Sequence, residues 1–413
     1  MEEEEAPLLF RCPISMDLMA DPVTIATGVS YERKNIEKWL LTYKRSTCPA
    51  TMQHLDTLDL TPNHTLKRLI STWLDKQSAN PNTTDQRSTG DLISRLTDIE
   101  SSPFKVNSLR SLKSMLETSE EMQNRLLRSG GIEVLARIMS QATAAADITD
   151  FSAFRACEEA AGVVSVLPLY DEASSSAAEI LLRPKCVKPM TAILQRGSAE
   201  ARIATMDILV KMARINRKWI DALGDDQNTE VLKSLLDLLS DEISTRKLSS
   251  LSLEVLLSIV AGSKGGRSRA VDVGAVPVLI ELLPDADRHT CERILLLLKR
   301  LCECPEGRSA FAEHAMGVAA VAKKILRVSD GGTKVGVKIL WLVCSFFPTE
   351  KVLDEMMASG AVKKLLALVH VDGRPSTKEK AIKIIRMHGM TWRQYPCFPG
   401  ELRDYLRLMH ETC

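Results

Sequence analysis

Phe10-Arg11-Cys12-Pro13-Ile14-Ser15 opens the stretch, residues 10–74, from which the N-terminal fold can be predicted. The words that follow in this stretch are Asp21-Pro22-Val23, Gly28-Val29-Ser30-Tyr31-Glu32-Arg33, Asn35-Ile36-Glu37-Lys38-Trp39-Leu40, Cys48-Pro49-Ala50-Thr51 and Thr61-Pro62-Asn63-His64-Thr65-Leu66. Pro and Gly punctuate the stretch, and its apolar residues come in short groups. This pattern predicts a small α+β module with tight turns.

Two helices are predicted within this stretch. The first begins near residues 30–34 and turns Ile36 and Leu40, four residues apart, toward the core, with Trp39 at the rim of that face. The second begins at Thr61-Pro62-Asn63, where the Asn63 side chain can cap free amide groups. The predicted apolar stripe of this second helix is Leu66, Leu69, Ile70 and Trp73.

A module of about 65 residues has a small core, which metal ions or disulfides often support. This stretch holds Cys12 and Cys48, with His54 and His64, at none of the spacings expected of zinc ligands. We therefore expect no metal and no other cofactor. Cys12 is interpreted as a small buried residue rather than a nucleophile, because nothing near it in the sequence would lower its thiol pKa dependably.

These words, in this order, resemble the U-box of ubiquitin ligases. The resemblance implies the cross-brace shape of a RING domain, held by salt bridges and hydrogen bonds instead of zinc. It implies a core that includes Cys12, Pro22, Tyr31, Ile36 and Leu40. The candidates for the polar network are Ser15, Asp17, Asp21, Ser30, Glu32, Arg33, Thr51 and Gln53, and the three assigned to it are Asp21, Arg33 and Thr51. Ordinary loop polar residues and caps are the alternative for about half of the larger set.

The same resemblance implies an apolar groove that receives a ubiquitin-conjugating enzyme. The first loop would supply Ile14 and Met16, the central helix Trp39, and the second loop Pro49. For Ile14 the alternative is a core isoleucine. A groove of this size suits weak, transient docking. No catalytic residue is expected, because such a ligase acts by holding its charged partner and the substrate lysine in a reactive orientation.

Met52 departs from the family pattern. RING-type ligases often carry a basic residue just after the Pro-x-Thr of the second loop, where it can hydrogen-bond both ubiquitin and the conjugating enzyme. This sequence has Met52 there, and Gln53 or a neighbour could substitute. If none does, the domain would dock its partner and activate transfer weakly. A non-catalytic scaffold or adaptor is therefore the alternative to an active ligase.

The chain of 413 residues is long enough for two or three domains. Its formal charge of +1 indicates neither nucleic acid nor an anionic membrane as a partner. Ten cysteines without paired spacing are interpreted as reduced thiols of an intracellular protein, and no signal peptide or membrane-spanning run is expected. Residues 78–90 lack aliphatic runs and carry Pro, Gly and Asn, which predicts a linker.

A repeat follows this linker. A Leu-rich helical word recurs six times, and successive copies begin 55, 44, 45, 42 and 44 residues apart. The aliphatic residues that mark the copies are Ile132, Val187, Val231, Val276, Val318 and Val362. This is the armadillo/HEAT period, which arises because a unit of two or three short helices buries its apolar face by stacking on its neighbours. The longer first step predicts an inserted surface loop at 141–152 or 170–176.

Three glycine turns resemble the turn before the last helix of an armadillo repeat: Arg128-Ser129-Gly130-Gly131, Asp272-Val273-Gly274-Ala275-Val276 and Ala358-Ser359-Gly360-Ala361-Val362. With the U-box before them, the whole chain resembles a plant U-box armadillo-repeat ligase. Residues 304–308, 323–329 and 392–397 resemble the subgroup that restrains immune and stress signalling. The resemblance implies a cytoplasmic protein whose repeats hold protein substrates, and it allows a homo-oligomer.

The predicted fold is mainly α. It comprises a U-box at 5–77, a linker at 78–90, a right-handed α-superhelix of armadillo repeats at 91–390 and a tail at 391–413. Two basic clusters, residues 214–218 and 378–383, are interpreted as solvated helix faces, with docking of an acidic substrate as the alternative. The scattered histidines indicate no metal site.

Overall fold

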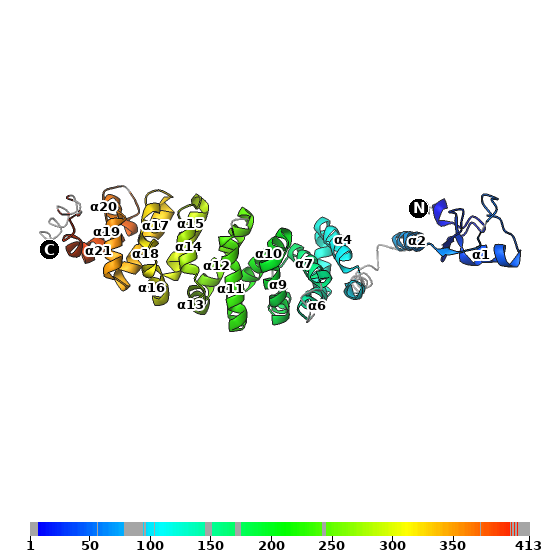
Figure 1. The fold of residues 1–413 in the computed structure, drawn as a ribbon, viewed down its shortest axis with the longest axis horizontal. Helices are drawn as coiled ribbons and strands as arrows, with labels where there is room; N and C mark the ends of the chain where they lie inside the picture. The colour runs from blue at the N-terminus through cyan, green and yellow to red at the C-terminus, as the bar shows by residue number, and fades with distance from the viewer. Residues whose placement is uncertain are drawn as a thin grey trace. The chain divides into compact units, whose positions relative to one another are not determined.

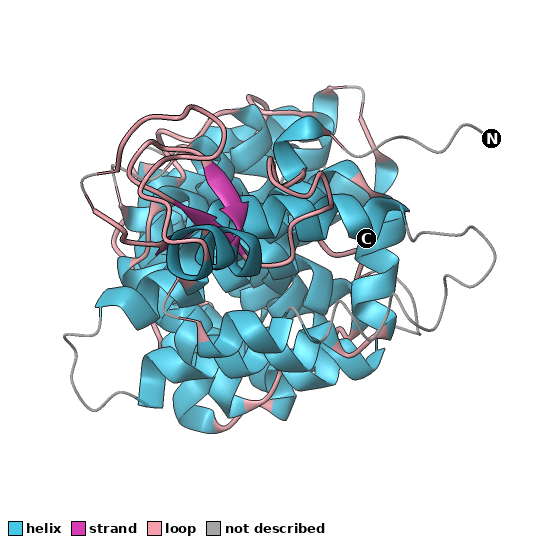
Figure 2. Ribbon diagram, turned by 90° about the vertical axis from the view of Figure 1, so that its right-hand side faces the viewer, coloured by secondary structure: helices cyan, strands magenta, loops and turns pink. Residues whose placement is uncertain are grey.

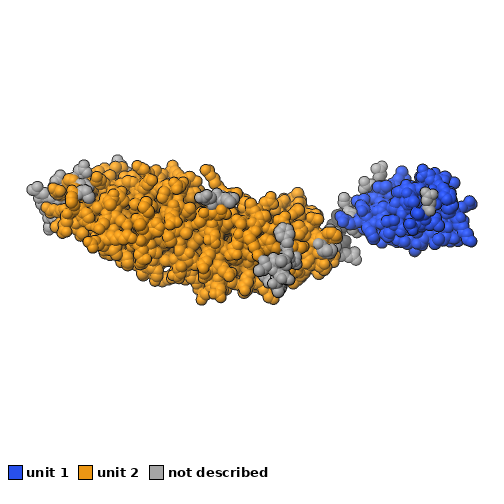
Figure 3. All heavy atoms as spheres, in the orientation of Figure 1, with its two compact units in different colours: residues 1–88 blue, residues 89–413 orange. Residues whose placement is uncertain are grey.

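The protein forms two compact units, residues 1–88 and residues 89–413 (Figure 3). The computed structural model describes residues 7–55, 57–77, 94, 96–102, 104–144, 151–169, 175–241, 245–371, 373–396, 398, 400 and 403. Each unit has its own apolar core. Among the described residues, strands occur in the N-terminal unit and the C-terminal unit is helical (Figure 2). The linker predicted at 78–90 lies outside the described residues.

The N-terminal unit is built on a small antiparallel sheet. β1 (Pro22–Thr24) pairs with both β2 (Ser30–Glu32) and β3 (Thr61–Pro62), so the strand order is β2-β1-β3. In this register Val23 lies opposite both Tyr31 and Pro62. The remaining elements are the 3₁₀ turn η1 (Leu8–Phe10), α1 (Arg33–Glu37), the π-helical turn η2 (Lys38–Thr42) and α2 (His64–Gln77).

The residues predicted for the core of this unit, Cys12, Pro22, Tyr31, Ile36 and Leu40, are all buried. The Asn63 side-chain oxygen accepts a hydrogen bond from the Leu66 amide at 3.0 Å, which confirms the predicted cap of α2. Leu66 and Ile70 are buried, and Trp73 packs edge-on against Phe10. Leu69, however, is 50% exposed, so the predicted stripe was wrong at this position. It lies at the edge of the inward face, beyond the reach of so small a core.

The C-terminal unit is a stack of helix triplets that follows α4 (Lys105–Thr118). Each triplet contains a short helix of 4–9 residues, a middle helix of 8–16 residues and a long helix of 14–18 residues, in that order along the chain. The short elements are α5 (Glu120–Arg128), α8 (Ser175–Leu181), η4 (Trp219–Ala222), α13 (Lys264–Asp272), α16 (Pro305–Glu313) and α19 (Glu350–Ala358). The middle helices are α6 (Gly131–Ala144), α9 (Pro184–Arg196), α11 (Asp225–Ser240), α14 (Ala275–Leu282), α17 (Gly317–Lys324) and α20 (Ala361–His370). The long helices are α7 (Phe151–Val166), α10 (Ala199–Ile215), α12 (Arg246–Gly262), α15 (Arg288–Leu301), α18 (Asp330–Phe346) and α21 (Pro375–Trp392).

The six predicted repeat words all lie in the middle helices, which confirms the repeat. Gly130, Gly274 and Gly360 have φ of 80°, 88° and 72°, a left-handed turn that favours glycine. We expected this turn to precede the last helix of a repeat, and this was wrong, because a longer helix follows each middle one. Both the middle and the long helices are apolar on their buried sides, and α15 carries an uninterrupted apolar run at residues 294–298, so the Leu-rich word alone does not identify the last helix of a repeat.

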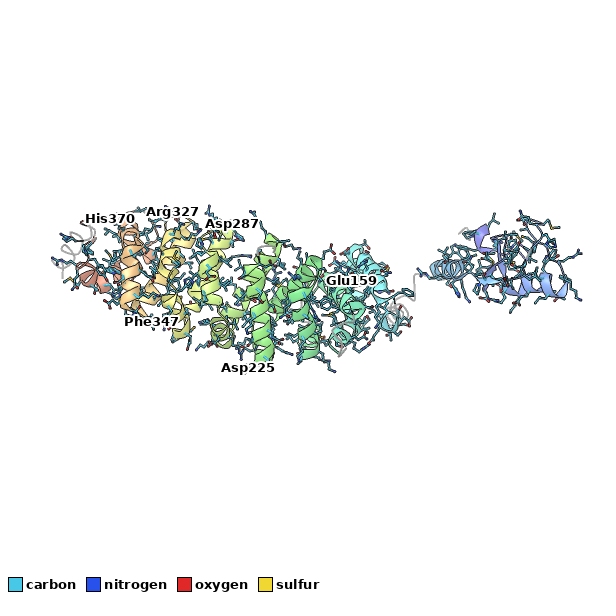
Figure 4. The ribbon with its side chains drawn as sticks, in the orientation of Figure 1. Glu159, Asp225, Asp287, Arg327, Phe347 and His370 are labelled. Carbon is cyan, nitrogen blue, oxygen red and sulfur yellow. The ribbon has the colours of Figure 1, made fainter. Side chains whose placement is uncertain are left out.

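The long helices pack side by side in chain order, and so do the middle helices, which gives two layers along the unit (Figure 1). Asp287, Arg327 and His370 lie along one edge of these layers, and Asp225 and Phe347 lie along the opposite edge (Figure 4). The first three residues lie where a middle helix leads into a long one. Middle and long helices therefore run antiparallel.

Two further predictions fall near gaps in the described chain. The loop expected at 141–152 or 170–176 is described in part, since residues 145–150 and 170–174 lie outside the description. α6 continues to Ala144 and α7 begins at Phe151, so the flanks of the first candidate are helical rather than looped. The start of the tail predicted at 391–413 belongs to the helical core, because Trp392 is buried and its indole donates to the Leu353 carbonyl at 3.1 Å. None of the described helices is long and apolar enough to span a membrane.

Candidate functional site: an apolar surface on two matching loops

Two loops of the N-terminal unit, residues 10–19 and 46–55, have the same backbone hydrogen bonds. In the first loop the Cys12 amide donates to the Asp17 carbonyl at 2.8 Å, and in the second the Cys48 amide donates to the Gln53 carbonyl at 2.9 Å. The hydrogen bonds from the Met16 amide to the Cys12 carbonyl and from the Met19 amide to the Phe10 carbonyl also have counterparts 36 residues later in the chain. The isolated β-bridge between Arg11 and Leu18 has its counterpart between Thr47 and His54. The two loops are therefore copies of one backbone conformation.

The sequence carries this duplication as Cys12-Pro13-Ile14-Ser15-Met16 and Cys48-Pro49-Ala50-Thr51-Met52, a repeat that our sequence analysis missed. Both loops place the methionine in the left-handed region, with φ of 60° in the first and 59° in the second. That conformation costs a non-glycine residue about 1–2 kcal/mol. Both methionine side chains are exposed, so the strained turn points them toward solvent.

A buried thiol anchors each loop to the rest of the unit. The Cys12 sulfur accepts hydrogen bonds from the Glu32 amide at 3.3 Å and from the Asn35 side chain at 3.6 Å. The Cys48 sulfur lies 3.0 Å from the Tyr31 hydroxyl. Within the described residues, no group of three or more His, Cys, Asp or Glu side chains is placed to hold a metal ion.

The surroundings of these thiols correct one prediction. We expected nothing near Cys12 to lower its pKa, and this was wrong. Burial opposes ionisation of Cys12, but hydrogen bonds from Asn35 and from backbone amides outweigh it, so its pKa is lowered. Burial likewise opposes ionisation of Cys48, but donors that include the Thr27 hydroxyl lower its pKa to about 6. Asn35 lies 23 residues from Cys12 and Thr27 lies 21 residues from Cys48, so a local reading of the sequence cannot find them.

Asp21 and Arg33, two of the three residues assigned to the polar network, are joined directly. The Arg33 side chain donates to the Asp21 carboxylate at 2.6 Å, and Lys67 from α2 lies 3.1 Å from the same carboxylate. These two cations hold the pKa of Asp21 below its usual value. The Glu32 carboxylate accepts hydrogen bonds from the amides of Ala20 and Asp21, at 2.8 and 2.9 Å. The network therefore ties the end of the first loop to β2, α1 and α2.

Two other candidates for the network, Thr51 and Ser30, have partners outside the Asp21–Arg33 pair. The Thr51 hydroxyl donates to the Gln53 side chain at 3.5 Å, and both residues are exposed. Ser30 lies away from the loops, where its hydroxyl contacts Thr24 at 2.8 Å and accepts from Asn63 at 3.0 Å. Thr51 thus stays within the second loop, and Ser30 belongs to the sheet.

One face of the central helix, which is formed by α1 and η2 in succession, holds both loops. Asn35 and Trp39 are four residues apart and share this face. The Asn35 side chain donates to the Ser15 hydroxyl at 3.0 Å, in the first loop, and the Trp39 indole donates to the Thr47 carbonyl at 2.8 Å, in the second. Ser15 and Thr47 are close in sequence to Ile14 and Pro49, which brings the predicted docking residues to the same helix. Sequence reasoning missed Asn35, although its spacing from Trp39 was visible.

The side chains on this surface are apolar and accessible. Ile14 is 38% exposed and Met16 is 53% exposed, so the alternative of a core isoleucine was wrong. Trp39 and Pro49 are half-buried. Leu41, on η2, is also exposed and was not predicted. Exposed apolar side chains from two loops and one helix are typical of a site that binds another protein.

Comparison with known proteins identifies the family. Residues 6–79 match the family described as U-box domain, and residues 89–404 match the family described as plant U-box protein ARM repeat region. The chain belongs to the plant U-box armadillo-repeat family of E3 ubiquitin ligases. The N-terminal unit is thus the U-box, the C-terminal unit consists of armadillo repeats, and the enzyme class is that of RING-type ubiquitin transferases.

Relatives match this U-box protein over nearly its whole length. It is 34% identical to the E3 ubiquitin-protein ligase PUB23 of Arabidopsis thaliana, over 97% of each chain. It is 32% identical to the E3 ubiquitin-protein ligase PUB22 of the same plant, over 98% of this chain and 99% of that one. Among solved structures, one from a study of the interaction between cadherin and β-catenin has a TM-score of 0.58 at 15% identity, covering 78% of this chain and 58% of that one. An engineered protein has a TM-score of 0.52 at 18% identity, covering 80% and 75%. At these identities the likeness of the two structures concerns the fold alone.

Proposed function

We propose that the U-box docks a ubiquitin-charged conjugating enzyme on Ile14, Met16, Trp39 and Pro49 and positions it for transfer to a substrate held by the armadillo repeats. The observation that carries the proposal is the attachment of both loops to one helix face, through Asn35 and Trp39. Because both loops are fixed to the same helix, their exposed apolar side chains form one preorganised surface. Preorganisation lowers the entropic cost of docking.

No residue of the U-box needs to act as acid, base or nucleophile in this function. The amine of a substrate lysine attacks the thioester carbonyl on the conjugating enzyme, an amide bond forms, and the thiol of the conjugating enzyme leaves. The ligase contributes orientation, which in well-positioned reactions lowers the barrier by about 7–11 kcal/mol. A weak docking surface suits this role, because the spent conjugating enzyme must leave after each transfer.

The long-helix layer of the armadillo repeats is the surface proposed to hold the substrate. A cleft of about 370 Å³ lies between α10 and α12. Val210 and Val255 contribute apolar lining, and Arg214 and Glu254 contribute charges. A cleft that combines apolar walls with a few charged groups can receive one side chain of a partner and fix its orientation.

The docking proposal can be tested by autoubiquitination with purified components. Ile14→Ala and Trp39→Ala are expected to abolish most polyubiquitin formation, because each removes apolar area from the centre of the surface. Leu69→Ala is the matched control, since Leu69 is an exposed apolar residue on α2, outside the surface. Calorimetry should show an unchanged U-box transition for Ile14→Ala. Full polyubiquitin formation by both groove variants would contradict the groove assignment.

A scaffold that docks the conjugating enzyme without stimulating it is the second candidate. The observation in its favour is Met52, which is 69% exposed and occupies the position where a basic residue would contact ubiquitin. A native chain that binds the conjugating enzyme and yet forms no polyubiquitin would favour the scaffold.

We also propose that the protein is cytoplasmic, restrains defence or stress signalling, and self-associates. The resemblance of residues 304–308, 323–329 and 392–397 to the immune and stress subgroup supports the role in signalling. Imaging of a fluorescent fusion tests the location, elicitor responses of plants that lack the protein test the role, and light scattering of the purified chain tests self-association. A fluorescent fusion found in the nucleus would refute the cytoplasmic location. An elicitor response that is unchanged in plants without the protein would refute the signalling role, and a strictly monomeric mass would refute self-association.

A further inference from the structure

We propose that the C-terminal part of the long-helix layer binds an acidic segment of a protein substrate, rich in Asp and Glu, through Lys299, Lys338 and Lys380. The three lysines lie on successive long helices, α15, α18 and α21. This inference rests on the proposed function of the armadillo repeats, and it specifies the chemistry of what they hold.

Charges in the N-terminal part of this layer are matched between neighbouring helices. Arg110 of α4 lies 2.5 Å from the Glu159 carboxylate of α7. Arg214 of α10 lies 3.0 Å from the Glu254 carboxylate of α12, and Arg293 of α15 lies 3.9 Å from the other oxygen of that carboxylate. These three arginines of the layer therefore already have carboxylate partners within the protein.

The C-terminal part of the layer is different, because lysine faces lysine. Burial lowers the pKa of Lys338, and the charges of Lys380 and Lys299, on the two neighbouring helices, lower it further. Within the part of the chain that the structure describes, Lys338 and Lys380 form no ion pair, and the Lys380 ammonium donates to the Ser376 carbonyl at 3.1 Å. Glu379, next to Lys380, lies 2.7 Å from Lys383 instead.

Glu303 is the carboxylate that acts on Lys338, and it is already shared among other cations. Lys299 lies 3.4 Å from it, Arg300 3.3 Å and Arg267 3.5 Å. The single negative charge of Glu303 is therefore shared by three cations, and Lys338 and Lys380 add two further positive charges nearby. The local excess of positive charge is what a carboxylate-rich partner would neutralise.

Aromatic and apolar side chains adjoin the lysines and favour a polypeptide over nucleic acid. The Lys338 ammonium lies 3.7 Å from the centre of the Trp341 ring, which holds it in place by a cation–π interaction. The Trp341 ring packs edge-on against Phe346, which is 57% exposed. Met387 of α21, also exposed, lies 4.0 Å from the Ser345 hydroxyl on α18. A chain with a formal charge of +1 also lacks the broad basic surface that phosphate backbones require.

The spacing of the helices sets the length of the segment. Packed helices lie about 8–10 Å apart, so three neighbouring helices span roughly 20 Å. An extended peptide covers that distance in about six residues. A short acidic run can therefore contact all three lysines at once.

The test is fluorescence anisotropy of the full chain with the labelled peptide Glu-Asp-Glu-Phe-Glu-Asp-Glu, and with Gln-Asn-Gln-Phe-Gln-Asn-Gln as the neutral probe. We expect the acidic probe to bind more tightly and its affinity to fall with added salt. The triple variant Lys299→Gln, Lys338→Gln and Lys380→Gln should bind it roughly tenfold more weakly. Replacing the same three lysines with Arg should preserve binding, which excludes a loss caused by misfolding.

The matched control changes three exposed lysines of α9 and α11, as Lys185→Gln, Lys188→Gln and Lys233→Gln. It removes the same net charge and should leave the affinity unchanged. Equal affinity of the wild type and the first triple variant, or of the two probes, would overturn the inference. Discharge of the charged conjugating enzyme to free lysine by the native chain tests the proposed function separately. Normal discharge without binding of the acidic probe means that this inference alone has failed, and charge-dependent binding without discharge means that only the ligase function has failed.

Discussion

Removing the hydroxyl of Tyr31 should loosen the second loop from the sheet. Tyr31 is fully buried, and its hydroxyl lies 3.0 Å from the Cys48 sulfur and accepts a hydrogen bond from the Ala50 amide at 3.1 Å. Tyr31→Phe keeps the ring and removes both interactions. Leaving buried polar groups unpaired costs about 1–3 kcal/mol each, but Ala50 is exposed and its amide can be rehydrated. We therefore expect the free energy of unfolding of the U-box to fall by about 1–2 kcal/mol.

Differential scanning calorimetry of the full chain measures this change, because the U-box and the armadillo repeats have separate cores. For a unit of this size, 1–2 kcal/mol corresponds to a drop of about 4–16 °C in the U-box transition. Tyr43→Phe is the matched control, since Tyr43 is 56% exposed, and it should leave the transition in place. A U-box transition that does not move in Tyr31→Phe would refute the idea that this hydroxyl holds the loop.

Three further outcomes are expected. Gly262→Ala should destabilise the armadillo repeats by about 1–3 kcal/mol in urea unfolding, because its Cβ would lie 2.0 Å from a backbone oxygen. Gly224→Ala is the control, since its Cβ meets nothing within 4 Å, and it should be neutral. Equal unfolding midpoints of the two variants would contradict this prediction. Asp21→Asn should lower the U-box melting temperature at neutral pH. The difference in melting temperature between variant and wild type should shrink as pH falls below 3.8, because the pKa of Asp21 is lowered in the folded protein and its stabilisation is lost once the carboxylate is protonated. A difference that does not depend on pH would argue against the ion pair. Met52→Arg should speed discharge of the charged conjugating enzyme to free lysine, with Met316→Arg as the exposed control, and an unchanged rate would count against a missing activator at this position.

The repeat and the U-box could be predicted because their signals are periodic or local. The spacing of the six Leu-rich words follows from stacking, and it survived although the helices differ in length. Asn63 could be assigned as a cap because the hydrogen bond it makes spans three residues. The order of helices within a repeat could not be derived from the same words, because apolar runs also occur in the long helices, as at residues 294–298 of α15, and a run alone does not tell which helix of the repeat it marks.

The docking residues could be proposed by resemblance, but the contacts that hold them depend on distant residues. Asn35 donates hydrogen bonds to Cys12 and Ser15, which lie 23 and 20 residues before it in the sequence. Lys67 of α2 forms an ion pair with Asp21. No local rule pairs residues separated by 20 to 46 positions. The prediction that Leu69 is buried failed for a related reason, since the width of the buried face of a helix depends on the size of the core that the helix covers.

The duplication of the loops explains how position 52 can alter function without altering the fold. Met52 occupies in the second loop the place that Met16 occupies in the first, with the same positive φ and the same hydrogen bond from its amide to the cysteine carbonyl. Arginine and methionine are both unbranched at Cβ, so an arginine at this position adds no backbone strain beyond what methionine already carries. Met52 is 69% exposed, so an arginine side chain at this position would extend into solvent. We therefore expect a change at Met52 to affect the proposed docked partner and to leave the structure of the loop unchanged.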